Sequence, residues 1–87
     1  MELKQLTAFA AVYEEGSMSR AAERLQITQP NISIMIRKLE AELGATLFER
    51  HSGGTWPSIK AESFYPHVQL LLAQAATARA SVSDSAP

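Results

Sequence analysis

The chain has 87 residues, no cysteine and a formal net charge of −1, with eight Lys and Arg against nine Asp and Glu. A chain of this size forms one small domain, and the lack of cysteine excludes disulfides and thiolate metal sites, which fits a cytoplasmic protein. No apolar run is long enough to span a membrane, the N-terminus has no signal-peptide pattern, and the near-neutral charge argues weakly against nucleic acid, so local charge must decide.

The first predicted element is an amphipathic helix over residues 3–15, which ends before Gly16. Its apolar residues recur at spacings of three and four: Leu3, Leu6, Phe9, Ala10 and Tyr13. A second, short helix is expected to begin at a capping serine, either Ser17 or Ser19. Its expected inward residues are Ala21, Ala22 and Leu25, and its expected exposed residues are Arg20, Glu23 and Arg24. The small inward residues permit close approach of the two helices.

The third predicted helix covers about residues 29–43, with Thr28 as its N-cap and Gly44 at its end. Its expected inward residues are Ile32, Ile36, Leu39 and Leu43, and its expected outward residues are Pro30, Ile34, Arg37, Lys38 and Ala41. Two helices joined by a short turn, with the longer helix second, predict a helix-turn-helix unit. At this point an ordinary three-helix core remains the alternative.

A β-hairpin is predicted directly after the third helix. Residues 46–48 favour a strand, and the Ser-Gly-Gly sequence at residues 52–54 favours a tight turn. Thr55 and Trp56 favour a return strand that stops at Pro57. A hairpin in this place would be a wing, and a plain connecting loop is the alternative.

A long helix is predicted from a Ser58 cap to about residue 83. Its apolar residues alternate spacings of four and three: Phe64, Val68, Leu71, Ala75, Ala78 and Val82. Such a helix would be on the order of 35 Å long, more than a small core needs, so much of the stripe is expected to meet another chain. The alternative is a helix that lies wholly on its own domain. Pro66 predicts a kink near residues 62–66.

Two sequence patterns, "L..L..F..V.E.GS" and "AA..L..TQP..S..I..LE.ELG..LFER", fall at fixed spacing within residues 3–50. With a weaker continuation to about residue 80, they closely resemble the N-terminal domain of LysR-type bacterial transcriptional regulators. The resemblance implies a mainly α winged helix-turn-helix, with three helices and a short β-hairpin wing, over residues 1–57. A linker helix over residues 58–83 and a tail over residues 84–87 would then lead to an effector-binding domain absent from this chain.

The resemblance also implies a function: sequence-specific binding of double-stranded DNA at a pseudo-palindromic operator. It implies a homodimer formed through the linker helix and a tetramer in the full-length protein. No cofactor is expected in this domain, and a small-molecule co-inducer is expected for the absent C-terminal domain. The expected dimer residues are Phe64, Val68, Leu71, Ala75 and Ala78.

The expected DNA-binding residues cluster at the start of the third helix and at the wing. Gln29 can pair with adenine, Ser33 with several bases or a phosphate, and the Thr28 hydroxyl lies where a helix N-terminus attracts phosphate. Arg37 and Lys38 can neutralise backbone charge. The full set is Arg20, Thr28, Gln29, Pro30, Asn31, Ser33, Ile34, Arg37, Lys38, Arg50 and His51.

Local charge supports DNA binding on this side of the molecule. Between Ser17 and Lys38 the basic residues are Arg20, Arg24, Arg37 and Lys38, against Glu23 alone. Ile34 stands where family members commonly carry a basic residue. Our hypothesis is that Ile34 contacts a thymine methyl, and the alternative is an ordinary exposed side chain.

Three other functions are alternatives to DNA binding by a LysR-type regulator. A winged helix like that of molybdate-responsive regulators, or one used only for protein contacts, would share much of this pattern. Catalysis is disfavoured because only His51 and His67 could act as general bases near neutral pH. Neither histidine has a convincing nucleophile or metal spacing around it, and the chain has no phosphate-binding glycine loop. The chain is therefore predicted not to be an enzyme.

Overall fold

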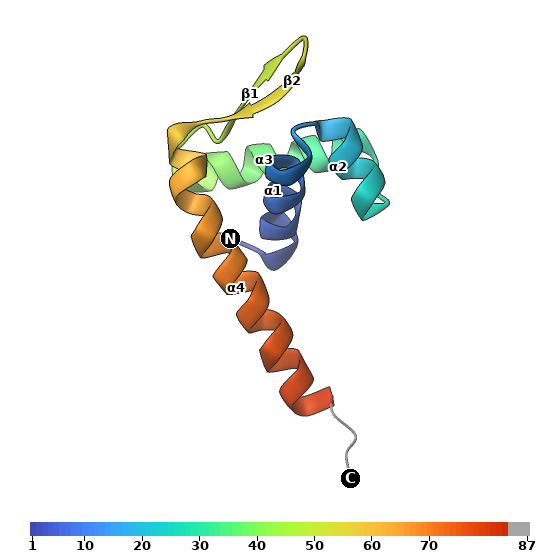
Figure 1. Cartoon of the computed structure of the whole chain (residues 1–87), viewed down its shortest axis with the longest axis vertical. Helices are drawn as coiled ribbons and strands as arrows, with labels where there is room; N and C mark the ends of the chain where they lie inside the picture. Colours follow the sequence, from blue (N-terminus) through green and yellow to red (C-terminus); the bar gives the residue numbers. More distant parts are fainter. Residues whose placement is uncertain (84–87) are drawn as a thin grey trace.

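The computed structural model describes residues 1–83 and has four helices and one two-stranded sheet in that part of the chain (Figure 1). In chain order the elements are α1 (Leu3–Glu15), α2 (Met18–Leu25), α3 (Gln29–Leu43), β1 (Phe48–His51), β2 (Gly54–Pro57) and α4 (Ile59–Ser83). The predicted mainly α fold with a hairpin is confirmed. The tail predicted at residues 84–87 lies outside the described residues. Among residues 1–83 no helix has the length and apolar character needed to cross a membrane.

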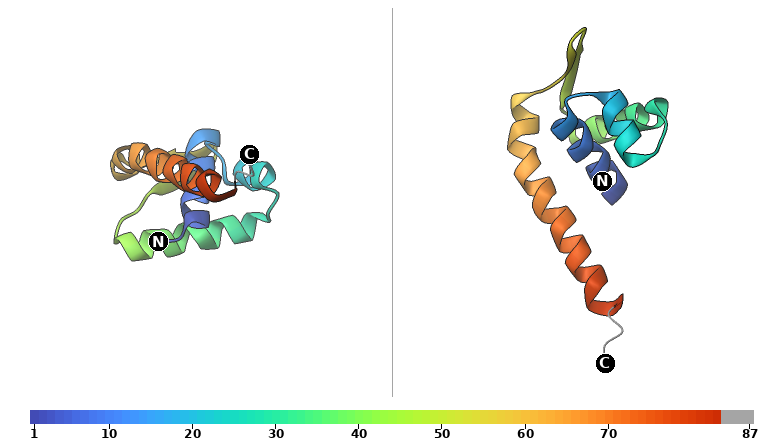
Figure 2. Two further views of the ribbon diagram at one scale, coloured as in Figure 1. Left: turned by 90° about the horizontal axis from the view of Figure 1, so that it is seen from below. Right: turned by 45° about the vertical axis from the view of Figure 1, so that its right-hand side comes forward.

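The core is built around α1, which lies between α3 and α4 (Figure 2). Its buried side chains include Leu6, Phe9 and Val12, and α3 contributes Ile32, Ile36 and Leu39. These residues confirm the inward stripes predicted for both helices. The predicted inward position is wrong for two residues of these stripes: Leu3 is 46% exposed and Leu43 is 39% exposed. Each lies in the terminal turn of its helix, where the helix extends past the core.

Both helices of the helix-turn-helix unit, α2 and α3, begin with the expected capping hydrogen bond. Ser17 Oγ accepts from the Arg20 N–H at 3.1 Å, and Thr28 Oγ1 accepts from the Asn31 N–H at 3.2 Å. Both caps are confirmed, because these hydroxyls bind N–H groups that have no partner within the helix. The caps set where α3 begins and therefore which of its residues are exposed at the N-terminal end.

The hairpin pairs β1 with β2 in antiparallel register, from Phe48 opposite Pro57 to His51 opposite Gly54. The strand predicted to begin at Thr46 is wrong, because β1 begins at Phe48. The Thr46 carbonyl accepts from Ser58 Oγ at 2.7 Å, and the Leu47 carbonyl accepts from the Ser58 N–H at 2.8 Å. These bonds hold residues 46–47 against the start of α4 and not in the strand ladder.

The wing is also fixed to the turn between α1 and α2. The Thr55 N–H donates to the Gly16 carbonyl oxygen at 3.0 Å. At the neighbouring Gly54 the backbone has φ +143°, and a Cβ atom there would lie 2.9 Å from that same oxygen. Only glycine fits this conformation and this close approach without strain. The position of the wing therefore depends on Gly54.

We expect Gly54→Ala to reduce the free energy of unfolding by about 1–3 kcal/mol, because the new methyl group would meet a backbone oxygen that cannot move freely. Urea unfolding followed by circular dichroism measures the change. Gly53→Ala is the matched control, since a Cβ at Gly53 meets nothing within 4 Å. Equal unfolding midpoints for the two variants would contradict this role of Gly54.

The long helix α4 packs on the domain through its first half only. Ala61 and Val68 are buried, and Phe64, Tyr65 and Leu72 are partly buried against the core. The second half extends away from the domain (Figures 1 and 2) and gives the molecule a long dimension of 53 Å. The alternative of a helix lying wholly on its own domain is therefore wrong for the second half.

The start and the course of α4 test two further expectations. Ser58 Oγ accepts from the Ala61 N–H at 3.1 Å, which confirms the predicted cap. The helix continues unbroken through Pro66, and neither Figure 1 nor Figure 2 shows the predicted kink. Packing of residues on both sides of Pro66 against α1 holds this segment to one axis.

Candidate nucleic-acid interface

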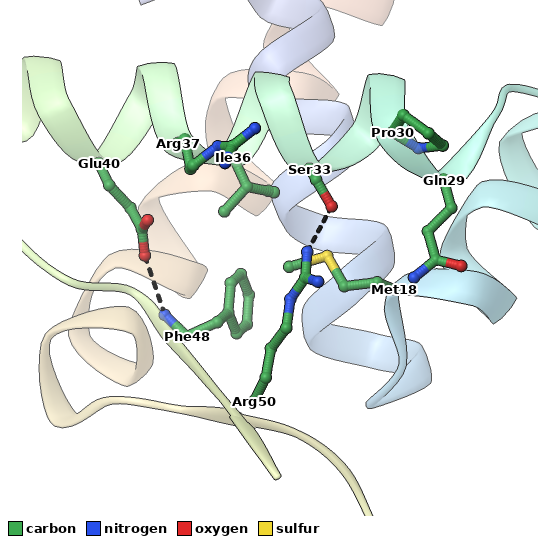
Figure 3. A pocket seen from close by; sticks show the side chains of 9 residues that line it. All are labelled: Met18, Gln29, Pro30, Ser33, Ile36, Arg37, Glu40, Phe48 and Arg50. Atoms are coloured by element: carbon green, nitrogen blue, oxygen red, sulfur yellow. Dashed lines mark hydrogen bonds between the residues drawn. The ribbon is translucent and has the colours of Figure 1, made fainter. Parts of the chain in front are cut away.

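An open groove of about 590 Å³ lies between α3 and the first wing strand (Figure 3). Five of the predicted DNA-binding residues line it: Gln29, Pro30, Ser33, Arg37 and Arg50. Its other lining residues are Met18, Ile36, Glu40 and Phe48. The fold therefore brings the start of α3 together with a wing residue that lies far from it in the sequence.

Glu40 fixes the base of the wing to α3. Its carboxylate accepts from the Leu47 N–H at 2.7 Å and from the Phe48 N–H at 3.2 Å. Hydrogen bonds to an ionised acceptor are stronger than those between neutral groups. Sequence reasoning missed this role of Glu40. The available signal was a carboxylate near the end of a helix, a few residues before a strand whose first N–H groups need an acceptor.

Arg50 reaches from the wing to α3. Cross-strand pairing places Arg50 on the same hairpin face as Phe48, and this face looks toward α3. The Arg50 guanidinium donates to Ser33 Oγ across the groove (Figure 3). The sequence grouped Arg50 with His51 as flanking residues of the wing. In the fold Arg50 instead turns inward against α3.

His51 lies on the opposite, outer face of the hairpin with Glu49 and Trp56. Its Nε2 atom is 3.5 Å from the Glu49 carboxylate, and its ring packs edge-on against Trp56 with centroids 5.9 Å apart. Trp56 is 56% exposed and was not among the predicted site residues. A tryptophan two residues after the glycines of a turn was the signal available in the sequence. The two predicted wing contacts, Arg50 and His51, thus lie on opposite faces of the hairpin.

The outer surface of α3 is open to solvent as predicted. Ile34 is 42% exposed, which confirms its outward position. Ser33 is half-buried at the groove, and the other predicted residues of this surface are all exposed: Thr28, Gln29, Pro30, Asn31, Arg37 and Lys38. This surface therefore offers a partner a polar N-terminal end, with an apolar isoleucine among the polar and basic residues.

The charge balance of this side needs one correction. Arg24 Nη1 lies 2.8 Å from the Glu14 carboxylate and 3.3 Å from that of Glu15, so its charge is already paired. The Tyr65 hydroxyl donates to Glu14, and this bond together with Arg24 holds the pKa of that carboxyl below its ordinary value. Within residues 1–83 the basic residues of this side without an ion pair are Arg20, Arg37 and Lys38. The basic surface is smaller than the sequence indicated.

The predicted dimer residues divide into two groups. Val68 has no exposed surface and Phe64 packs on Phe9 with ring centroids 5.1 Å apart, so both belong to the chain's own core. For Val68 the assignment to a dimer interface is therefore wrong. Leu71 and Ala78 are exposed and Ala75 is half-buried. The exposed large apolar residues of α4 beyond this predicted set include Leu70 at 70% and Val82 at 84%.

Three helices followed by a hairpin that is hydrogen-bonded to the third helix define a winged helix-turn-helix protein. The family model for the bacterial regulatory helix-turn-helix protein, lysR family, matches residues 3–62. The chain belongs to this family. The resemblance seen in the sequence is confirmed by this match.

Known proteins of the family are similar over nearly the whole chain. The HTH-type transcriptional regulator ShiR of Corynebacterium glutamicum (strain R) is 41% identical over 83 residues, which cover 95% of this chain and 28% of ShiR. The chain therefore spans less than a third of that relative's length. Among solved structures, the BenM DNA-binding domain in complex with catB site 1 DNA is 37% identical with a TM-score of 0.90, covering 95% of this chain and 93% of that one. The CbnR DNA-binding domain in a DNA complex is 37% identical with a TM-score of 0.87 and 90% of each chain covered.

Proposed function

We propose that this chain binds double-stranded DNA in a sequence-specific manner, as the DNA-binding unit of a LysR-type transcriptional regulator. The observation that carries the proposal is the exposed N-terminal half of α3, which begins at the Thr28 cap and has the wing strand fixed along its flank by Glu40 and Arg50. Such a helix fits the major groove of DNA. The similarity to the BenM and CbnR domains, which were solved with DNA, supports it.

Separate residues on this surface carry the two components of DNA binding. Arg20, Arg37 and Lys38 contact phosphates and supply affinity that does not depend on sequence. Gln29, Ser33 and Ile34 read base edges in the major groove, with Pro30 and Asn31 beside them. Thr28 places the N-terminus of α3 near a phosphate, and His51 contacts the backbone or minor groove from the wing. The chain acts by binding and not by catalysis, and this agrees with its similarity to transcriptional regulators.

We also infer a homodimer formed through α4. The second half of this helix has no domain to pack on, and its exposed residues include Leu70 and Leu71. A two-fold dimer presents two copies of α3, so the operator is pseudo-palindromic with half-sites separated by whole helical turns. In the full-length protein a tetramer and a small-molecule co-inducer would depend on a further domain. Such a protein works in the cytoplasm, where its DNA lies.

The salt dependence of DNA binding tests the proposed function. We expect a selected operator to bind with a dissociation constant on the order of nanomolar, and we expect the logarithm of the association constant to fall with that of salt concentration with a slope of several units. Fluorescence anisotropy at several salt concentrations, with random DNA as competitor, measures both. A flat salt response, or equal affinity for random DNA, would leave protein contacts as the function. The family match already favours the LysR type over a molybdate-responsive regulator.

Ile34 is proposed to contact a thymine methyl, since it is a large apolar side chain exposed on the reading surface of α3. We expect Ile34→Arg to shift the preference at one base pair of each half-site from T·A toward G·C, by about tenfold or more. Selection of bound sequences from a random DNA pool, run in parallel with both proteins, measures the shift. An unchanged preference would mean that Ile34 is ordinary exposed surface.

A further inference from the structure

The hydrogen bond between Arg50 and Ser33 joins the wing to the recognition surface (Figure 3). We propose that Arg50 is a positioning residue for base recognition. Its guanidinium donates to one lone pair of Ser33 Oγ and leaves the Ser33 O–H free to donate to DNA. Ser33 thereby favours a base edge that accepts a hydrogen bond. This inference rests on the proposed DNA-binding function and names the chemistry that one of its residues reads.

The direction of the hydrogen bond follows from the two groups. A guanidinium carries only N–H donors, so Ser33 Oγ must be the acceptor. Hydroxyls on helices commonly donate to a carbonyl one turn back, as Thr7 does to Leu3 at 3.0 Å and Ser81 does to Ala78 at 2.7 Å. Ser33 makes no such bond in the described part of the chain. Its hydrogen therefore remains available to a ligand, and the charge of Arg50 strengthens it as a donor.

The location of Ser33 favours a base edge over a phosphate. Ser33 lies one helical turn after Gln29, and both side chains line the groove that Arg50 faces. The N-terminal residues of a recognition helix are those that contact base edges. In the major groove guanine, adenine N7 and thymine O4 offer acceptors, whereas cytosine offers only its N4 donor. With one of its two lone pairs bound to a cation, Ser33 is a better donor than acceptor, so it disfavours cytosine at the position it reads.

A second contact keeps Arg50 in place. Glu40 lies seven residues after Ser33 on α3 and binds the N–H groups at the start of β1. Seven residues span roughly 10 Å along a helix and return to nearly the same side. The strand is thus tied to α3 near both ends of the contact, so it cannot pivot about one of them. The guanidinium reaches Ser33 from a fixed direction, which is what orienting a hydroxyl requires.

A double-mutant cycle read out as base preference tests this proposal. The proteins are the wild-type chain, Ser33→Ala, Arg50→Gln and the double variant, and the ligands are the selected operator and its single-base-pair substitutions. We expect Arg50→Gln to reduce discrimination at one base pair about five- to tenfold, as loss of one oriented hydrogen bond would. Ser33→Ala should lose the same discrimination at the same base pair. Adding Arg50→Gln to Ser33→Ala should cost no further discrimination there.

Arg37→Gln is the matched control, because Arg37 lines the same groove and has no ion pair within residues 1–83. It should weaken binding to every sequence equally and reduce the salt slope by about one unit. If Arg50→Gln behaves in this way too, Arg50 is a phosphate contact and the proposal is wrong. If Arg50→Gln lowers discrimination fully in the Ser33→Ala background, Arg50 reads a base edge without Ser33, and the proposal is wrong as well. Failure of the wild-type chain to prefer any DNA sequence would instead overturn the proposed function, together with the inference that rests on it.

Discussion

We expect Phe9→Ala to destabilise the chain strongly, so that it unfolds at a much lower urea concentration than the wild-type chain. Phe9 has no exposed surface, and its ring packs within 6.5 Å, centroid to centroid, of four other aromatic rings. These are the rings of Tyr13, Phe48, Phe64 and Tyr65. They belong to α1, β1 and α4, so one side chain joins the helical core to the wing and the long helix.

Truncating a buried phenylalanine costs about 3–5 kcal/mol, against a total stability of roughly 5–10 kcal/mol for a small domain. Circular dichroism and urea unfolding measure the loss. Ile59→Ala is the control, because Ile59 is 82% exposed and its truncation should change stability by about 0.5 kcal/mol or less. If Phe9→Ala unfolded at the same urea concentration as this control, Phe9 would not be the centre of the core.

We expect Leu71→Glu to convert the proposed dimer to a monomer without unfolding the domain. Leu71 is 43% exposed in the single chain, so a glutamate there can reach water. In a helix-to-helix seam the same carboxylate would be buried without a partner, which is costly. Affinity for a two-half-site operator should then fall by a factor on the order of a hundred or more, because the second half-site is no longer held by the first.

Sedimentation equilibrium and DNA titration measure these two effects. Ala73→Glu is the matched control: Ala73 is exposed, and two residues on from Leu71 it points to nearly the opposite side of α4. It should leave the oligomeric state and the affinity unchanged. A dimer that survives Leu71→Glu would show that subunits associate through another surface.

Much of the helical framework could be predicted because its signals are local. Thr28 caps α3 through a bond to a backbone N–H three residues away, and Gly16 and Gly44 end α1 and α3 where expected. The outward position of Ile34 follows from the same 3.6-residue period that buries Ile32 and Ile36. Such signals act within one or two helical turns, so no knowledge of the rest of the fold was needed.

The wing was less predictable because its bounds depend on partners outside it. Residues 46–47 have the side chains of a strand, yet their carbonyl oxygens bind Ser58 and the N–H groups of Leu47 and Phe48 bind Glu40. The stripe of α4 was also misassigned in part. Apolar spacing shows that Val68 is buried, but it does not say whether its own core or another chain buries it.

The helices, their caps, most of their exposed faces and the family pattern follow from local features of the sequence. Which side chains remain free to bind a partner depends instead on how the elements pack: Arg24 is paired with Glu14, Arg50 is bound to Ser33, and His51 lies on the other face of the wing. The difference arises from the range of the interactions. Helix period and capping connect residues three or four apart, whereas these side chains meet partners on other elements and are placed by how the elements pack.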